Sequence, residues 1–153
     1  MKKIYVILFF LFFAGFAKSQ CTINTSYTAP GLYPDTLPIG YVGQSYSQDI
    51  TFVMPLDTMG YPFTNFHILS VSLPVGLNWQ CNNVANGCNY NPQVSQYGCV
   101  NVYGTPLLAG QYNIDVTVIA DLSIIQGVPV TFQIYMEILP SNVSVSNRSE
   151  EHT

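Results

Sequence analysis

The chain contains four cysteines, and their spacing limits whether they can bind a metal or form disulfide bonds. They are Cys21, Cys81, Cys88 and Cys99. Cys81 and Cys88 stand too far apart for the usual pair of zinc ligands, and no histidine lies near them, so a metal site is disfavoured. In an exported chain an even number of cysteines predicts disulfide bonds, here two, with three possible pairings. A hairpin favours Cys81 with Cys99 and leaves Cys21 with Cys88, but the local Cys81–Cys88 loop is an open alternative.

Side chains that could catalyse a reaction are few and scattered. His67 is the one histidine before residue 148, and it shares an apolar row with Leu69 and Val71, which favours a structural role over that of a general base. The acids between residues 20 and 147 are Asp35, Asp49, Asp57, Asp115, Asp121 and Glu137. They suggest neither the carboxylate pair of a glycoside hydrolase nor the clustered run of a calcium loop. We therefore expect no catalytic residue, no bound metal and no cofactor.

The long irregular stretch 82–98 carries side chains suited to recognition. Its candidate binding residues are Asn89, Tyr90, Asn91 and Tyr97. Tyrosine rings stack on sugars and anchor protein interfaces, and loops on a rigid scaffold often carry binding sites. The alternative is structural, with the tyrosines covering the end of the domain and the asparagines making turns. Both interpretations stay open at this point.

The two ends of the chain are not expected to belong to the folded domain. Residues 1–19 combine a basic start, an apolar run from Ile4 to Phe16 and a small-residue cleavage site, which is typical of a secretory signal peptide. Residues 148–153 look like the translation of a sequencing adapter. We therefore expect the natural protein to be longer and to continue beyond about Asn147.

Positive charge is confined to these ends. The four cations are Lys2, Lys3, Lys18 and Arg148, so residues 20–147 contain no lysine or arginine. Nucleic-acid affinity depends largely on cations that neutralise phosphates, and anionic membranes attract basic patches. We expect no nucleic-acid partner and, once the signal peptide is removed, no membrane insertion. A surface of uncharged polar residues suits a secreted or cell-surface domain, whose ligand would be a protein or a glycan.

Alternating apolar residues predict that strands, not helices, position these side chains. The inward rows are Tyr46, Ile50, Phe52 and Met54; His67, Leu69, Val71 and Leu73; Leu77, Trp79 and Cys81; Val100 and Val102; Tyr112, Ile114, Val116 and Val118; and Val130, Phe132, Ile134, Met136 and Ile138. The residues between them, such as Thr51, are expected to face water. Two such sheets packed face to face give an all-β, immunoglobulin-like β-sandwich of about seven strands.

Local motifs refine this architecture. Gly110-Gln111-Tyr112 predicts a tyrosine corner, in which the phenol bonds back to the preceding loop. Trp79 is expected to be buried against a disulfide. We divide the chain into a Pro/Gly-rich extended leader (20–41), the sandwich (42–140) and a linker (141–147).

Three turn motifs carry a family resemblance. Leu73-Pro74-Val75-Gly76-Leu77, Val102-Tyr103-Gly104-Thr105-Pro106 and Ala109-Gly110-Gln111-Tyr112 follow one another as in the immunoglobulin-like (cadherin-like) repeats of bacterial surface proteins. The resemblance covers about Gly43 to Leu139. It implies a non-catalytic module that serves adhesion or protein interaction or acts as a spacer; the alternative is a carbohydrate-binding accessory module of a secreted hydrolase.

The leader extends the resemblance. Its stretch Pro30–Thr36 looks like the start of such domains in proteins exported by the type IX system of gliding Gram-negative bacteria. That group adds O-glycans at Asp followed by Ser or Thr and a small or apolar residue. The resemblance therefore implies O-glycosylation at Thr36 in Asp35-Thr36-Leu37 and at Thr58 in Asp57-Thr58-Met59, and the mature protein would be a glycoprotein.

Overall fold

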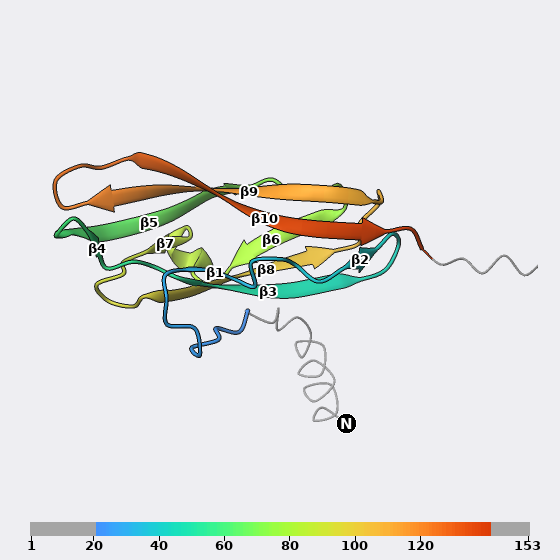
Figure 1. The fold of residues 1–153 in the computed structure, drawn as a ribbon, viewed down its shortest axis with the longest axis horizontal. Helices are drawn as coiled ribbons and strands as arrows, with labels where there is room; N and C mark the ends of the chain where they lie inside the picture. The colour runs from blue at the N-terminus through green and yellow to red at the C-terminus, as the bar shows by residue number, and fades with distance from the viewer. Residues whose placement is uncertain (1–20, 142–153) are drawn as a thin grey trace, which may run out of the picture.

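Strands with alternating apolar side chains build two packed sheets (Figure 1). The computed structural model describes residues 21–141; the expected signal peptide, the linker beyond Ser141 and the adapter-like residues 148–153 lie outside the described residues. One sheet has four strands in the order β1-β3-β8-β6, and the other has six, in the order β2-β10-β9-β5-β4 with β7 paired to β5. The strands are β1 (Gly31–Tyr33), β2 (Gly40–Tyr41), β3 (Tyr46–Val53), β4 (Asp57–Thr58), β5 (Tyr61–Val71), β6 (Leu77–Cys81), β7 (Asn89–Tyr90), β8 (Tyr97–Gly104), β9 (Gly110–Leu122) and β10 (Val128–Leu139), with a short 3-10 turn at Val84–Asn86.

The order of the strands is that of an immunoglobulin domain. With the two-residue strands β2, β4 and β7 set aside, the four-stranded sheet has the order A-B-E-D and the other sheet the order G-F-C. β2 pairs in parallel with the end of β10, so the first strand of the domain starts in one sheet and finishes in the other. The predicted all-β, immunoglobulin-like sandwich is confirmed.

The β9–β10 pair follows the predicted alternation most closely. Ile114 lies opposite Ile134 in the antiparallel ladder, and both are buried. Met136 and Ile138, further along β10, are also buried in the core, where they meet the apolar face of the other sheet. Phe132 keeps this alternation and faces the gap between the sheets, but it is 41% exposed because the two sheets separate there.

The predicted inward row of β5 is wrong in its first half. Phe66 and Ile68 face the core, whereas Leu69 is 55% exposed. The pairing of β5 with β9 shifts register between Ile68 and Ser70, as at a β-bulge, so the side chains beyond this point change faces. Val71 returns to the edge of the core. A period of two cannot reveal an extra residue in one strand.

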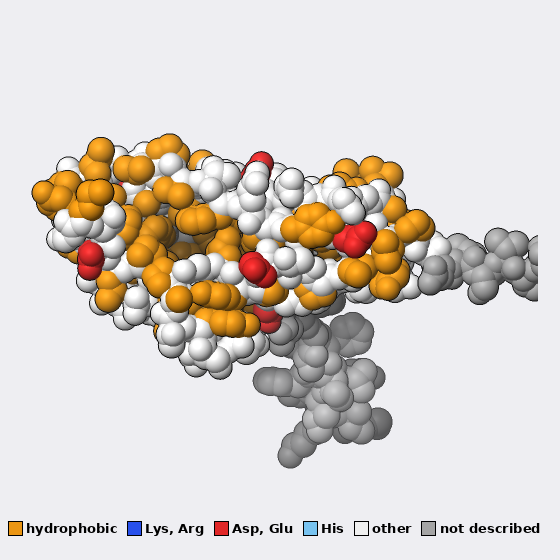
Figure 2. Space-filling view, viewed as in Figure 1, with side chains coloured by type: hydrophobic (Ala, Val, Ile, Leu, Met, Phe, Trp, Pro, Cys, Tyr) orange, Lys and Arg blue, Asp and Glu red, His pale blue; other side chains and the backbone are white. Residues whose placement is uncertain are grey.

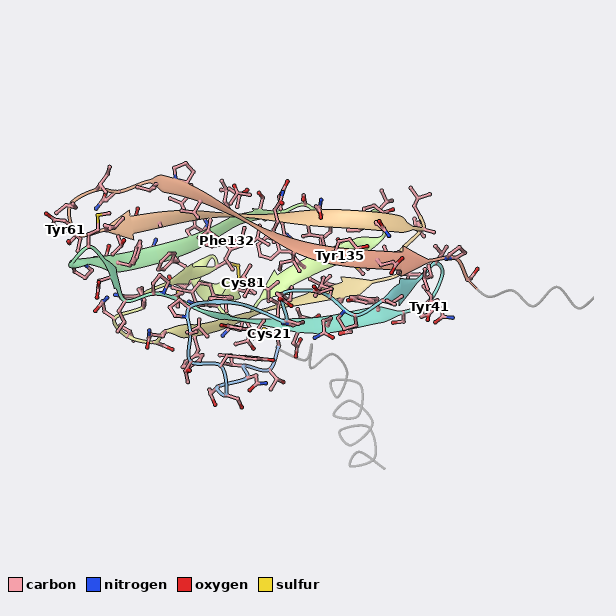
Figure 3. All side chains as sticks on the ribbon, viewed as in Figure 1. Cys21, Tyr41, Tyr61, Cys81, Phe132 and Tyr135 are labelled. Atoms are coloured by element: carbon pink, nitrogen blue, oxygen red, sulfur yellow. A yellow bond between two sulfur atoms is a disulfide. The ribbon has the colours of Figure 1, made fainter. Side chains whose placement is uncertain are left out.

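The preferred disulfide pairing is also wrong, and the local alternative is right. The bonds are Cys81–Cys88 and Cys21–Cys99. Cys81 lies opposite Val100 in the β6–β8 ladder, and both belong to the core, so Cys99 points to the other face of the sheet. There it meets Cys21, which lies on the outer side of β3 and β8 (Figure 3).

This bond holds the N-terminal residues across the outer face of the four-stranded sheet. The backbone N–H groups of Thr22 and Asn24 donate to Asp49 Oδ2 and Thr51 Oγ1, both at 2.9 Å. Thr51 is therefore buried, although its side of β3 was expected to face water. The covering segment, which periodicity within β3 cannot predict, explains the difference.

Candidate functional site

Among the candidate binding residues, Tyr90 belongs to the core rather than to the surface. Its side chain is 7% exposed, and its ring packs edge-on against Phe52 with 4.9 Å between the ring centroids. Its hydroxyl donates to Asn82 Oδ1 at 2.8 Å, and burial raises the pKa of Tyr90 to about 12. The ring is therefore not available to stack on a sugar at the surface.

The two asparagines of the same loop make the bonds that shape it. Asn89 Nδ2 donates to the carbonyl oxygen of Asn86 at 2.8 Å, while Asn89 Oδ1 accepts from Asn65 at 3.2 Å. Asn91 Oδ1 accepts from the backbone N–H of Gln93 at 2.9 Å, which is an Asx turn. These bonds fit the structural interpretation, and a binding role for the loop stays a prediction.

Tyr97 links this region to the N-terminal segment. Its hydroxyl donates to the carbonyl oxygen of Tyr27 at 2.9 Å, and the Tyr27 ring stacks on Tyr33 with centroids 4.1 Å apart. Together with the Cys21–Cys99 bond, these contacts fix the leader against the four-stranded sheet.

Two Gly-x-Tyr motifs form matching corners, of which the one at Tyr112 was predicted from the sequence. As predicted, the hydroxyl of Tyr112 donates to the carbonyl oxygen four residues earlier, at Leu108, at 3.0 Å. The hydroxyl of Tyr33 makes the same bond to Ala29 at 2.9 Å. In each motif a Cβ added at the glycine would meet the tyrosine side chain within 3.4 Å. The repeated Gly-x-Tyr spacing is the signal that would have found the second corner.

The remaining predicted residues lie apart from one another. His67 is half-buried on β5, opposite Asn89 of β7, and Trp79 is partly buried against the core. Thr36 and Thr58 are both exposed, as a glycan would require, and their modification stays a prediction.

Several acids serve as acceptors within the fold. Asp49 accepts from Thr22 and, at 2.7 Å, from Asn101; Asp115 accepts from Gln133 at 2.9 Å. Within residues 21–141, no three His, Cys, Asp or Glu side chains lie close enough together to hold a metal ion. The same stretch contains no helix of the length and hydrophobicity needed to cross a bilayer.

Large apolar side chains are exposed together at one end of the sandwich, a feature that was not predicted from the sequence. Three loops bring them there: those between β3 and β5, between β7 and β8, and between β9 and β10. We call this surface the loop end; its residues are Leu56, Met59, Tyr61, Val94, Ile124 and Ile125. The β4 turn and the β9–β10 turn lie at this end in Figure 1, and Figure 2 shows hydrophobic side chains gathered over it.

Hydrogen bonds hold the three loops side by side. Gln93 Nε2 donates to the carbonyl oxygens of Leu56 at 2.8 Å and Phe63 at 3.0 Å, which joins the second loop to the first. The backbone N–H of Ser123 donates to the carbonyl oxygen of Pro62 at 3.0 Å, which joins the third. The loop end is thus a surface ordered by its own bonds. Its parts are separated by tens of residues, so no local sequence pattern reveals it.

Met59 is the most unusual residue of the loop end. It is 95% exposed at the tip of the β4–β5 hairpin, and its φ is 51°, in the left-handed region. Two-residue hairpins of this kind favour asparagine, aspartate or glycine at such a position, because a larger side chain is strained there. Neither burial nor backbone preference explains a methionine at this point. Backbone strain of this sort concentrates at functional sites.

Next to the loop end, the sheets separate around an apolar cavity of about 270 Å³. Its walls come from both sheets and from the residues just before β1. Its lining residues include Pro30, Leu32, Met54, Phe63, Val130 and Phe132. Figure 2 shows the hollow on the face between β1 and β10, with hydrophobic side chains around it.

Comparisons with known proteins give distant structural likenesses and no match in sequence. No family model matches the chain, and a sequence search of curated proteins finds no relative. Among solved structures, the VesB protease of Vibrio cholerae aligns with a TM-score of 0.43 at 14% identity, covering 71% of this chain and 31% of that one. A mutant of the SrpA adhesin of Streptococcus sanguinis aligns with a TM-score of 0.38 at 15% identity, covering 74% and 56%. The chain thus spans less than two thirds of either protein.

Proposed function

We propose that this chain is a non-catalytic immunoglobulin-like module of a secreted or cell-surface protein, and that its loop end binds an apolar patch on a partner protein. The observation that carries the proposal is the loop end itself, with large apolar side chains on three ordered loops. Contiguous exposed apolar surface of this kind marks interaction sites, because it is costly to leave in water. The β3–β5 and β9–β10 loops correspond to the B–C and F–G loops, which bind antigen in antibody variable domains.

The chemistry of the loop end defines the class of partner. No lysine or arginine occurs in residues 20–147, so the surface has no cation with which to attract phosphates or acidic peptides. Asp57 in β4 is an exposed acid at its rim. The binding energy would come from desolvating Met59, Val94 and their neighbours against apolar groups of the partner.

The proposal also includes that the protein is exported and that this module has no catalytic activity. Two disulfides are typical of proteins outside the cytoplasm, where thiols are oxidised. Three carboxylates accept hydrogen bonds within the fold, which is a structural role; they belong to Asp49, Asp115 and Asp121. The resemblance to the immunoglobulin-like repeats of bacterial surface proteins, including those exported by the type IX system, points to adhesion as the biological setting.

The alternative of a carbohydrate-binding module has less support. Binding of a glycan surface needs aromatic rings that share one platform. Figure 3 places Tyr61 at the loop end, Phe132 and Tyr135 at successive points along β10, and Tyr41 toward the opposite end. These four rings are too dispersed to act together on one sugar chain. Tyr27 and Tyr33 lie together, but both are only half-exposed and they stack on each other.

The test compares two matched double variants. Met59→Ser with Ile124→Ser removes apolar surface at the loop end, and Leu107→Ser with Leu108→Ser removes exposed leucines from the β8–β9 turn at the other end. Each variant and the wild type is immobilised and exposed to extracellular and surface proteins of the producing cells and of neighbouring species. Partners are identified by mass spectrometry, and affinities are then measured with the purified partner.

We expect the loop-end variant to bind the partner at least tenfold more weakly and the control variant to bind within twofold of the wild type. Equal affinity of the two variants would reject the loop end as the binding surface. Failure of the wild type to capture any partner would favour a spacer role. Binding of the wild type to a glycan array would favour the carbohydrate alternative instead.

A further inference from the structure

A second interaction surface lies where the edges of the two sheets face each other. We call the part of this boundary between β1 and the first half of β10 the open seam. β1 pairs with β3 only. β10 pairs with β9 along its length, but on its other side β2 covers only Ile138 and Leu139, and a single bridge joins Tyr135 to Thr36. Within the described part of the chain, Val128–Ile134 therefore has a free edge.

The backbone of this edge is ready to accept another strand. The carbonyl oxygens of Tyr135 and Leu139 point away from β9, since they accept from Leu37 at 2.9 Å and from Val42 at 3.0 Å. In an antiparallel pair this direction alternates from residue to residue, so Thr131 and Gln133 also direct their N–H and C=O groups outward. Pro129 has the same direction but no N–H to offer. The free edge thus presents two donors and three acceptors.

Behind the free edge lies the apolar cavity. Val130, Phe132 and Ile134, which alternate with the outward-facing positions, line it from β10. Apolar cavities stay dry, and one of roughly 150 Å³ is large enough to bind benzene. A cavity of about 270 Å³ therefore has room for about two large apolar side chains.

Next to the open seam, a segment of the chain itself already occupies the boundary between the two sheets, and it binds there as we expect a partner strand to bind. Leu37 is buried in the core, while its backbone N–H donates to β10 at Tyr135. One extended segment thus forms a backbone hydrogen bond with the edge of β10 and fills the gap between the sheets with a side chain. The segment diverges from β10 before Thr36, so Thr131 and Gln133 stay without such a neighbour among the described residues.

These observations select the chemistry of the occupant. A hydrocarbon chain would fill the cavity but would leave the donors and acceptors of the free edge unpaired. A sugar would bring hydroxyl groups to apolar walls. A β-strand with apolar side chains at alternate positions satisfies both the edge and the cavity, because its side chains point to opposite faces at successive residues.

We infer that the open seam is a docking groove for an extended peptide strand of a partner protein, which pairs with β10 at Thr131 and Gln133 and inserts two uncharged apolar side chains, two residues apart, into the cavity. The inserted residues must be uncharged because the cavity walls carry no group that could pair with a charge. This site is separate from the loop end, and neither proposal depends on the other.

The test uses a designed probe with the whole protein. The probe is the capped peptide Ser-Gln-Thr-Val-Thr-Leu-Thr-Gln-Ser, whose valine and leucine are the inserted pair. Its controls are the same peptide with aspartate in place of valine and leucine, and the same peptide N-methylated at its five central residues, which cannot pair with an edge. Affinity is measured by calorimetry, and amide exchange at Thr131 and Gln133 is followed by NMR.

We expect both control peptides to bind at least tenfold more weakly than the probe, and a saturating probe to slow amide exchange at Thr131 and Gln133 at least tenfold. Thr131→Pro removes an outward N–H and should weaken binding at least tenfold, whereas Thr131→Ala retains it and should bind within twofold of the wild type. If the proline variant does not fold, the comparison of the probe with its control peptides on the wild-type protein is sufficient to test the inference.

Three results would overturn the inference. They are an absence of probe binding, equal binding of the N-methylated peptide, and protection from exchange that maps outside β10. A medium-chain alcohol that binds the cavity while the probe does not would assign the site to small apolar molecules instead. The Met59→Ser, Ile124→Ser variant should bind the probe as the wild type does, which separates this test from that of the loop end.

Discussion

Removal of the two disulfides one at a time should cost unequal amounts of stability, because they close loops of very different length. The Cys21–Cys99 bond joins residues 78 apart in sequence, and the Cys81–Cys88 bond joins residues 7 apart. In the chain-entropy model, these loops correspond to about 4.5 and about 2.5 kcal/mol of unfolding free energy. The Cys21→Ala, Cys99→Ala variant should therefore be the less stable one by about 2 kcal/mol.

Urea denaturation followed by circular dichroism measures this difference without reductant. For a domain of this size the two losses correspond to falls in Tm of roughly 15 and 8 °C. Pairing is established beforehand on unreduced peptic peptides, since a chain without lysine or arginine from residue 20 to 147 offers trypsin no site there. A larger loss for the Cys81→Ala, Cys88→Ala variant would refute the reasoning, because loop closure would then not be the dominant contribution of the bonds.

Three further substitutions or conditions test the core. Gly98→Ala should cost about 1–3 kcal/mol, as measured by urea denaturation, because the added Cβ would collide with the ring of Phe52. Ile68→Ala should cost about 2–5 kcal/mol and Leu69→Ala less than about 0.5, and the reverse order would contradict the bulge in β5. Because burial raises the pKa of Tyr90 to about 12, ionisation should favour unfolding. The contribution of Tyr90 to stability should be unaffected below pH 10 and fall by about 1.4 kcal/mol per pH unit between 10 and 12. Burial also raises the pKa of Tyr46 to about 12, so Tyr46 should add a similar loss, and Tyr90→Phe should remove about half of the total.

The sequence was sufficient for features whose causes are local. The β9–β10 pair could be predicted because Ile114 and Ile134 sit in regular alternation, and the corner at Tyr112 because Gly-x-Tyr encodes its own turn. The side of the sheet on which Leu69 lies could not be predicted, since a bulge depends on how β5 pairs with β9. The partner of Cys99 depends on which face of β8 the residue occupies, and so on the whole ladder.

The candidate sites were the hardest part to predict for the same reason. The interpretation of the 82–98 loop as a binding surface rested on residue types, and tyrosine and asparagine are equally useful inside a fold, as Tyr90 demonstrates. The loop end assembles residues from three loops that only the β-sandwich brings together. What the sequence did offer was Met59-Gly60 in a hairpin turn, where methionine is the wrong residue for the backbone.

The absence of cations from the folded part gives the free edge of β10 its significance. Natural sheets commonly protect an exposed edge with lysine, whose charge repels an approaching strand, or with proline, which cannot donate. Residues 20–147 contain no lysine, so β10 relies on Pro129 at one end and on the chain's own segment at Thr36 and beyond at the other. The stretch left between them includes Thr131 and Gln133. It is too short to support extensive sheet-to-sheet association, yet it suits one strand that also fills the cavity. Selective binding, and not general aggregation, is therefore what this edge favours.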